Sequence, residues 1–430
     1  MKSSKRKIYQ VLALLSSGMG TTAAMAAGPL VQGGGSILVA PIIGATGNTT
    51  TEIGLFGTAE ATFMYYSAGP LAGQIAFLNN QPANLSANLT GTVDFGNSDV
   101  SLSTAGIASY QTGLGTTNGP LIQIPYIVTP IAISVVNGPT VTSTTTPQTT
   151  PNQAHSIALN DDDLCGIFSG KLTDWNQVTN PETGSAYALN APITVLYPPF
   201  GPETRRLSRH LAAVCTPSNT ASGVTFTETP SLSTSFPKGV PANFVSVTTS
   251  SGVRNALLSS SGAAVAYLSP DDTNTFLAPL STVAAASGAE QLQVASLVNT
   301  IDGKYYAPTY TNAAMALGTA AAPNNKIAAS DPVAWVPNIG NPAAGYPVVG
   351  TSQIILSQCY KDPNVTKALH DFLNDHYTNT SFASIVHGNG FGTIPSNFQT
   401  AISSDFLSNT SGYNLDIGNT SVCAGTVTGR

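Results

Sequence analysis

The stretch ITVLYPPFGPETRRLSRHLAAV (residues 193–214) places an apolar, β-branched run directly before a helical pattern. Residues 193–197 predict a strand and residues 204–214 predict a helix. The same alternation recurs along the chain, with further strands expected at 91–95, 122–133 and 348–356 and further helices at 161–168, 252–258 and 364–376. Strands that alternate with helices, with no internal repeat, predict an α/β fold.

Composition and charge limit the function classes open to the chain. With 430 residues, of which 42% are hydrophobic, it can bury a large core in two domains or in one composite domain. Only 8% of the residues are charged, and the formal net charge is −6. A nucleic-acid-binding protein needs a basic surface, so this class is excluded, as is membrane adsorption through Lys and Arg.

Residues 1–26 predict a signal peptide. They begin with four basic residues, continue with an apolar run at 11–15 and end in small residues, which predicts cleavage near Ala26. The apolar run is far shorter than the roughly 20 residues that a bilayer crossing requires, so we expect no membrane insertion. Without this leader the chain has 11 basic and 21 acidic residues and a net charge of −10. We therefore expect a soluble, exported protein, either periplasmic or secreted.

Four cysteines follow the leader: Cys165, Cys215, Cys359 and Cys423. An even number of cysteines in an exported chain predicts two disulfides, for which three pairings are open and sequential pairing is the simplest. No two of these cysteines have the two-residue spacing of a zinc knuckle, which disfavours a metal site.

No catalytic or metal-binding motif is evident. The five histidines are scattered, and His370 and His376, six residues apart on one expected helix, do not share a face. We expect the histidines to lie at the surface or at helix ends. The acidic triplet at 161–163 fits the start of a helix, where carboxylates offset the helix dipole, better than a calcium site. We therefore expect no metal and no cofactor, and we assign no catalytic residue.

The segment VDFGNSD (residues 93–99) ends an apolar strand in a small polar turn and the carboxylate of Asp99. Such a strand end is where α/β folds place groups that contact ligands. Taken alone, however, Asp99 fits an ordinary turn aspartate.

Several segments, in the same order along the chain, resemble one family. LCGIFSGKLTDWNQV (164–178), followed by PITVLY (192–197), resembles the exported phosphate-binding proteins of bacterial uptake systems and, more closely, their secreted relatives, the DING proteins. The resemblance continues in GPLIQIPYIVTPIAI (119–133), AVAYLSPD (264–271), DPVAWVP (331–337) and IGNTSVCAG (417–425). It spans nearly the whole chain after the leader.

This resemblance implies the type II periplasmic-binding-protein fold, in which crossover hinge strands join two α/β lobes and the ligand lies in the interlobe cleft. Lobe one would comprise residues 27–128 plus 348–430, and lobe two residues 129–347. The matching cysteines imply the pairs Cys165–Cys215 and Cys359–Cys423. Residues 138–154, rich in Thr and Pro, are expected to form an exposed insertion in lobe two.

The family binds phosphate without metals, through backbone amides, hydroxyls, one arginine and one aspartate. That aspartate accepts a proton that phosphate carries and sulfate lacks, so it repels sulfate. Matching residue by residue implies a ligand-binding set of Leu38, Ser67, Ser98, Asp99 and Thr204. Asp99 matches the aspartate, and Leu38 matches a leucine that contributes its backbone amide. Ser67 would substitute for a family serine that is Pro70 here.

The chain departs from the family at other positions of the site. The threonine that precedes the family's leucine is Ile37 here. The family's arginine-led segment at a helix start reads YPPFGPET (197–204), without the arginine. Pro202 removes an amide donor, and Glu203 adds a second carboxylate near the anion. Uncompensated loss of the arginine weakens binding roughly ten- to hundredfold.

Two neighbouring arginines could restore the missing charge. Arg205 or Arg206 does so only if it lies on the cleft side of the expected helix. We expect both on an exposed helix face instead.

We predict a solute-binding protein that captures inorganic phosphate or another small anion between its lobes. The resemblance implies a monomer with an ABC transporter permease as a partner, and nucleic acid is not expected as one. Two alternatives stay open: a secreted DING-type enzyme resembling alkaline phosphatase, and an extracellular surface or adhesion protein on the same scaffold.

Overall fold

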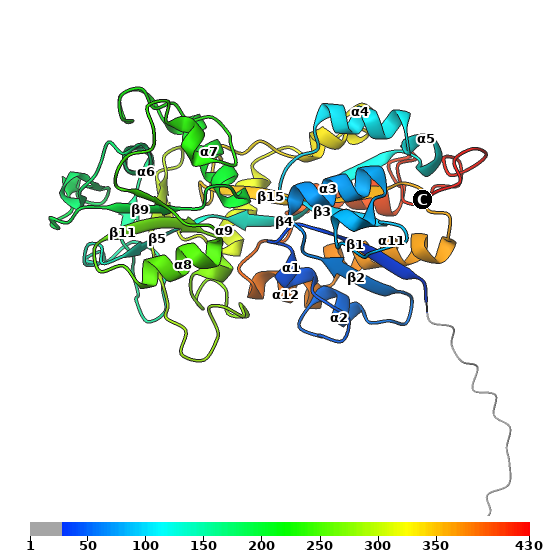
Figure 1. Cartoon of the computed structure of the whole chain (residues 1–430), viewed down its shortest axis with the longest axis horizontal. Coiled ribbons are helices and arrows are strands. Elements are labelled where there is room, and N and C mark those ends of the chain that lie inside the picture. Colours follow the sequence, from blue (N-terminus) through cyan, green and yellow to red (C-terminus); the bar gives the residue numbers. More distant parts are fainter. Residues whose placement is uncertain (1–27) are drawn as a thin grey trace, which may run out of the picture.

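Two five-stranded sheets form two lobes that lie side by side along the long axis of the molecule (Figure 1). The structure, a computed structural model, describes residues 28–430. The predicted signal peptide, residues 1–26, lies outside the described residues. Within 28–430, no helix has the length and apolar character that a membrane crossing requires. The predicted α/β fold is confirmed.

The first sheet has the strand order β2-β1-β3-β15-β4. Its strands are β2 (Thr62–Tyr66), β1 (Leu30–Gly35), β3 (Phe95–Ser98), β15 (Val349–Ser357) and β4 (Leu121–Pro130). Strands β1, β2 and β3 are parallel, whereas β15 runs antiparallel to both β3 and β4. The helices of this lobe are α1 (Ala40–Ile43), α2 (Glu52–Phe56), α3 (Pro70–Asn79), α4 (Thr104–Thr112), α5 (Gly115–Asn118), α11 (Pro363–Thr378), α12 (Thr380–Gly388) and α13 (Ser396–Ile402).

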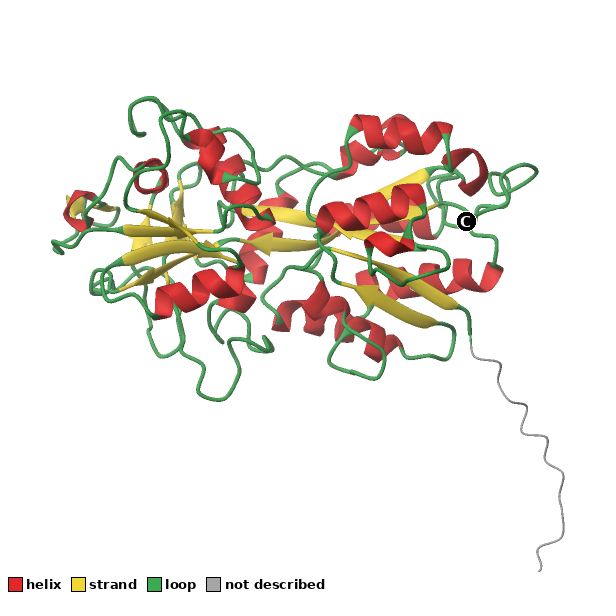
Figure 2. Ribbon diagram, in the orientation of Figure 1, coloured by secondary structure: helices red, strands yellow, loops and turns green. Residues whose placement is uncertain are grey.

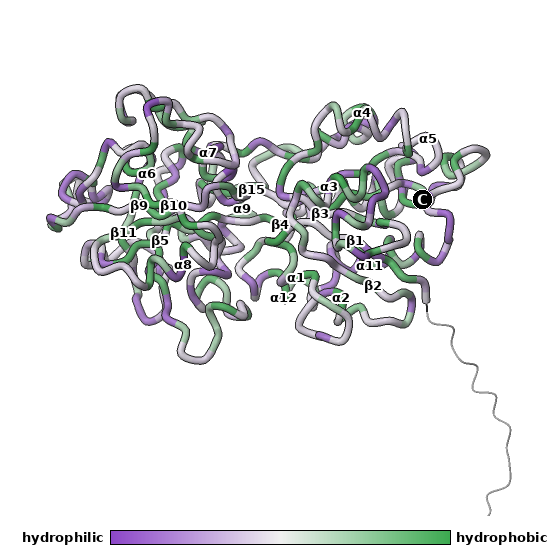
Figure 3. The backbone as a smooth tube through the Cα atoms, in the orientation of Figure 1, coloured by the Kyte–Doolittle hydropathy of each residue, from purple (hydrophilic) through white to green (hydrophobic). Residues whose placement is uncertain are grey.

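The second sheet has the order β10-β9-β11-β5-β12. Its strands are β10 (Phe244–Ser246), β9 (Thr194–Tyr197), β11 (Ala264–Leu268), β5 (Ala132–Val136) and β12 (Gln293–Val294). Its helices are α6 (Asp161–Ser169), α7 (Pro202–Val214) and α8 (Ser250–Leu258), whereas α9 (Tyr310–Gly318) packs on β4 and β15 of the first sheet and α10 (Lys326–Ala329) on the turn Pro332–Trp335 beside β4. Two small sheets complete this part, from β6 (Ala158–Leu159), β13 (Ser296–Asn299) and β14 (Lys304–Tyr306), and from β7 (Thr179–Asn180) and β8 (Ser185–Ala186). In both lobes helices flank the sheets (Figure 2), and the hydrophobic residues concentrate along the strands (Figure 3).

Two strand predictions need correction. The strand expected at 91–95 begins only at Phe95, because Gly91 has a positive φ of 92° and the pairing with β1 starts at Gly33 and Phe95. The strand expected at 122–133 is two strands, β4 and β5, which belong to different sheets. The chain changes sheets at Ile131, whose N–H donates to Val348 O at 2.8 Å.

The same place marks the return of the chain to the first lobe. Val349, the first residue of β15, pairs with Pro130, the last residue of β4, so both connections between the sheets run side by side (Figure 1). The β15–β4 register shifts between Ser352 and Gln353. Such irregularities re-aim side chains and recur beside functional sites. The limits given above for the lobes stay a prediction.

Both disulfides have the pairing that the resemblance implies. Cys165–Cys215 joins α6 to the end of α7, and Cys359–Cys423 joins the C-terminal segment to the residues that directly follow β15. Their sequence separations of 50 and 64 residues correspond to about 4 kcal/mol each in the chain-entropy description.

Burial corrects two further expectations. Residues 138–154 contain no helix or strand, yet Thr146, Thr149 and Thr150 are buried because their hydroxyls bond to neighbouring chain segments. His210 is buried within α7, contrary to expectation, and His376 lies in the last turn of α11 as expected but is buried as well. Each imidazole lies between a carboxylate and a backbone carbonyl: His210 contacts Asp161 and Gly340 O, and His376 contacts Glu52 and Tyr126 O.

Candidate anion-binding site

Asp99 lies directly after β3, at the carboxyl edge of the parallel part of the first sheet. Because β1 and β3 are parallel neighbours, with Gly35 opposite Asn97, the residue after β1 comes close to the residue after β3. The residue after β1 is Ser36, and its Oγ lies 2.8 Å from each carboxylate oxygen of Asp99. The Asp99 side chain is fully buried.

Ser352, on β15, supplies a second hydroxyl to Asp99. Gln353 pairs with Ser98 across the β15–β3 ladder, which places Ser352 beside Asp99. The Ser352 hydroxyl donates to Asp99 Oδ1 at 2.5 Å. The Asp99 carboxylate is thus held by two serines from strands that are far apart in sequence.

Arg206 reaches this carboxylate from the other lobe. It lies on α7, its side chain is only 2% exposed, and its Nη2 is 3.7 Å from Asp99 Oδ1. Nη2 also donates to Ser352 Oγ at 3.2 Å. Nε and Nη1 have no hydrogen-bond partner in the described part of the chain, although both are buried. Two charged donors therefore stay unpaired in a buried interlobe site.

The expectation that Arg206 lies on an exposed helix face is wrong, whereas Arg205 does lie outside the site. Arg205 is partly exposed, and its Nη1 pairs with Glu228 at 3.1 Å. Helical spacing explains the difference: Glu203, Arg206 and His210 recur at intervals of three and four residues on the buried stripe of α7. This periodicity was the sequence signal that could have placed Arg206 in the cleft.

Gly350, on β15, makes room for the guanidinium arm. A Cβ on Gly350 would lie 2.8 Å from both Cγ and Nε of Arg206. Any larger residue at this position must displace Arg206. Strand β15 therefore shapes the site in two ways: Ser352 contributes a hydroxyl, and the absence of a side chain at Gly350 leaves space for Arg206.

Burial shapes the electrostatics of the site. It lowers the pKa of Arg206, while the neighbouring Asp99 and Glu203 raise it. A guanidinium keeps its charge in proteins, so the site retains a cation. Burial, reinforced by Asp99, raises the pKa of Tyr65 well above its usual value. Tyr65 therefore stays a neutral phenol that donates to Ser36 O at 2.7 Å and holds the loop after β1.

The other residues of the predicted ligand set occupy different settings. The Ser98 hydroxyl donates to Val100 O at 2.8 Å, and Thr204 Oγ1 lies 2.8 Å from the hydroxyl of Tyr267. Leu38 is buried in the loop that follows Ser36. Ser67 is exposed and lines a cavity of about 500 Å³, whose wall also includes Leu280 and Thr282 of the second lobe. The structure thus brings Asp99 together with Arg206, but directs the side-chain hydroxyls of Ser98 and Thr204 to other partners.

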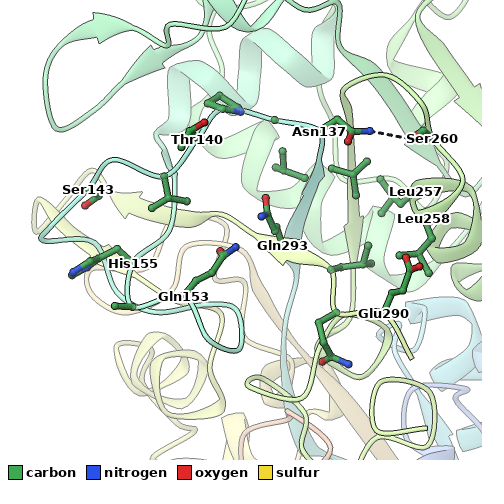
Figure 4. A pocket seen from close by; sticks show the side chains of 18 residues that line it. Asn137, Thr140, Ser143, Gln153, His155, Leu257, Leu258, Ser260, Glu290 and Gln293 are labelled. Carbon is green, nitrogen blue, oxygen red and sulfur yellow. Dashed lines mark hydrogen bonds between the residues drawn. The ribbon is translucent and has the colours of Figure 1, made fainter. Parts of the chain in front are cut away.

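A larger cavity, of about 780 Å³, lies on the second lobe between β5, β12 and α8 (Figure 4). Amides such as Asn137, Gln153 and Gln293 line it, and Glu290 and His155 are its titratable groups. Its lining includes no Lys or Arg, so none of its side chains offers an anion the charge-assisted bonds that Arg206 can.

Metal ligands do not cluster within residues 28–430: no three His, Cys, Asp or Glu side chains gather there in a way that could hold an ion.

Comparison with known proteins gives this geometry a family. The PBP superfamily domain matches residues 20–374. Alkaline phosphatase L of Pseudomonas aeruginosa PAO1 is 32% identical over 397 residues, which cover 91% of this chain and 92% of the relative. A phosphate-binding protein from an unknown prokaryotic organism is 31% identical over 381 residues, covering 84% and 92%.

A solved structure agrees with these relatives. The high-affinity periplasmic phosphate-binding protein PfluDING, determined with phosphate, has a TM-score of 0.69 and 28% identity, covering 93% of this chain and 99% of that one. The chain belongs to the PBP superfamily and, within it, to the family of the DING and phosphate-binding proteins.

Proposed function

We propose that this chain is an exported protein that binds inorganic phosphate between its two lobes, with Asp99 on one side of the anion and Arg206 on the other. The observation that carries the proposal is the pairing of two nearly inaccessible, oppositely charged side chains from different lobes. A buried guanidinium with unpaired Nε and Nη1 groups is a strong site for an anion, because charge-assisted bonds to oxygen would satisfy both donors.

The same residues give selectivity for phosphate. Asp99 accepts hydrogen bonds from Ser36 and Ser352 and, as a carboxylate, can also accept one from the P–O–H group of monohydrogen or dihydrogen phosphate. Sulfate has no proton at neutral pH, so its oxygen would face the carboxylate without a hydrogen bond. The α7 N-terminus adds a backbone amide: the first helical bond is from Arg205 N–H to Gly201 O, which leaves the N–H of Thr204 ahead of it, while the N–H of Glu203 bonds to that residue's own carboxylate.

The wider assignment follows from the family. Thr204 and Leu38 contribute through their backbone amides in this proposal, and Ser67 and Ser98 keep the roles that the resemblance implies. Lobe one is residues 27–128 plus 348–430, and lobe two is residues 129–347. Two disulfides and the predicted signal peptide support a periplasmic or extracellular location, with a transporter permease as partner.

A phosphomonoesterase is the second candidate, supported by the name of the Pseudomonas relative, alkaline phosphatase L. In that case Asp99 is the residue on which turnover should depend. Phosphatase activity that is unchanged in Asp99→Asn would point to a contaminating enzyme. The adhesion alternative stays untested.

Isothermal titration of phosphate-stripped protein with phosphate, and separately with sulfate, tests the proposal. We expect saturable binding of one phosphate per chain and no binding of sulfate at the same concentrations. Absence of phosphate binding would reject the proposal, and equal binding of both anions would reject the role of Asp99.

A further inference from the structure

The carboxylate of Glu203 lies where the positive ends of two helices meet. Glu203 is in the first turn of α7, and its Oε1 accepts from the hydroxyl of Ser250, the first residue of α8, at 3.0 Å. Its Oε2 lies 2.8 Å from the place that a Cβ on Gly201 would take, so the carboxylate folds back over the start of its own helix. Glu203 is 2% exposed. The chain has thus put its own carboxylate at a position that favours an anion.

This carboxylate belongs to the proposed anion site electrostatically. Arg206 lies one helical turn further along α7, and the charge of Asp99, in the first lobe, raises the pKa of Glu203. The second lobe adds Asp271, which follows β11, and Tyr267 on β11 itself. The titratable and charged groups that act electrostatically on Glu203 are therefore Arg206, Asp99, Asp271 and Tyr267. The single guanidinium of Arg206 must therefore offset the negative charges of at least two carboxylates, Asp99 and Glu203, as well as that of the bound anion.

We propose that Glu203 couples phosphate binding to proton uptake, so that one proton moves from the solvent to the Glu203 carboxylate when the anion enters the site. This inference rests on the proposed function. An ionised Glu203 competes with phosphate for the charge of Arg206 and also repels the phosphate anion. A protonated Glu203 carries no charge, so it neither competes nor repels, and it offers an O–H donor. No covalent bond changes in this step, and the proton comes from the buffer.

The environment of Glu203 agrees with such a role. Burial raises the pKa of Glu203, whereas its own backbone amide, Arg206 and Ser250 lower it and Asp99 raises it. An incoming anion adds another negative charge and raises the pKa of Glu203 further. The complex then binds more protons than the free protein. The affinity for phosphate therefore falls as pH rises between the pKa of Glu203 in the free protein and its higher pKa in the complex, by up to about tenfold per pH unit for one proton.

The test compares wild type, Glu203→Gln and the control Glu228→Gln. Glu228 pairs with Arg205 and Arg209 on the outer side of α7, so its loss changes the net charge equally without touching the cleft. Phosphate is titrated calorimetrically across pH 6 to 9 in buffers of different ionisation enthalpy, which gives the number of protons taken up. We expect Glu203→Gln to take up fewer protons than wild type and to bind at least about tenfold more tightly at the alkaline end. Glu228→Gln should behave as wild type.

Equal proton uptake and equal pH dependence in wild type and Glu203→Gln would overturn the inference while leaving the proposed function intact. Failure of wild type to bind phosphate at every pH would instead reject the proposed function, and this inference with it. If Glu203→Gln does not fold, infrared difference spectra of wild type with ¹³C-labelled glutamate decide the question. A carboxylic-acid band that appears on addition of phosphate supports protonation, and an unchanged band overturns it.

Discussion

Removal of the Arg206 guanidinium is the perturbation that bears most directly on the site. In Arg206→Ala, the buried Nε, Nη1 and Nη2 groups are lost while the Asp99 carboxylate keeps its bonds to Ser36 and Ser352. The variant therefore deletes the cation of the proposed site and leaves the proton acceptor in place.

The expected loss follows from the donors that Arg206 has free. One charge-assisted hydrogen bond is worth about 1.5–3 kcal/mol, so loss of a single bond to phosphate weakens binding about ten- to hundredfold. Loss of bonds from both Nε and Nη1 would weaken it further. Arg206→Lys should fall between wild type and Arg206→Ala, because it keeps the charge without the planar fork of donors.

Calorimetric titration with phosphate, on variants shown by circular dichroism to be folded, measures this loss. Arg205→Ala is the matched control: the residue is adjacent on the same helix but pairs with Glu228 outside the cleft. We expect Arg205→Ala to bind phosphate within about twofold of wild type. Folded Arg206→Ala with affinity within twofold of wild type would refute the assignment of Arg206 as the anchor of the anion.

Three further predictions concern selectivity, shape and pH. Asp99→Asn should bind sulfate measurably, since the amide offers an N–H donor where the carboxylate offered repulsion; continued exclusion of sulfate in a titration would contradict this role. Gly350→Ala should weaken phosphate binding at least about tenfold, because its Cβ would lie 2.8 Å from Arg206 Cγ; unchanged affinity would show that the arm relaxes freely. Burial raises the pKa of Asp94 to about 7 in the folded protein, whereas its pKa in the unfolded chain is near 4. Because burial favours the protonated carboxyl, the stability that Asp94 contributes is fully present below about pH 4 and is lost as pH rises through about 7. Urea unfolding of Asp94→Asn should therefore show less decline in stability between pH 4 and 8, by up to about 4 kcal/mol, and a decline equal to that of wild type would contradict the shift.

Local sequence patterns predicted the elements but not how they meet. The run at 193–197 and the periodicity at 204–214 gave β9 and α7 to within two residues, because strand and helix patterns depend on neighbouring residues. Residues 122–133 look like one strand because both β4 and β5 are apolar. The change of sheet at Ile131 depends on pairing with Val348, more than two hundred residues away.

The site was predicted unevenly for the same reason. Asp99 was found because it ends a strand and matches a family position. Ser36 and Ser352 were missed, since hydroxyl residues are abundant in this chain and only the register of β1, β3 and β15 brings these two to Asp99. The prediction of an exposed helix face for Arg206 is wrong, although the spacing from Glu203 to His210 marks the buried stripe.

A crystal structure of the protein grown with phosphate tests the central claim most directly. The account predicts a tetrahedral anion in the interlobe site, with one oxygen on Asp99 and others on Nε and Nη1 of Arg206. Phosphate bound elsewhere on the molecule, with Nη2 of Arg206 still directed at Ser352 and Asp99 as it is here, would contradict it.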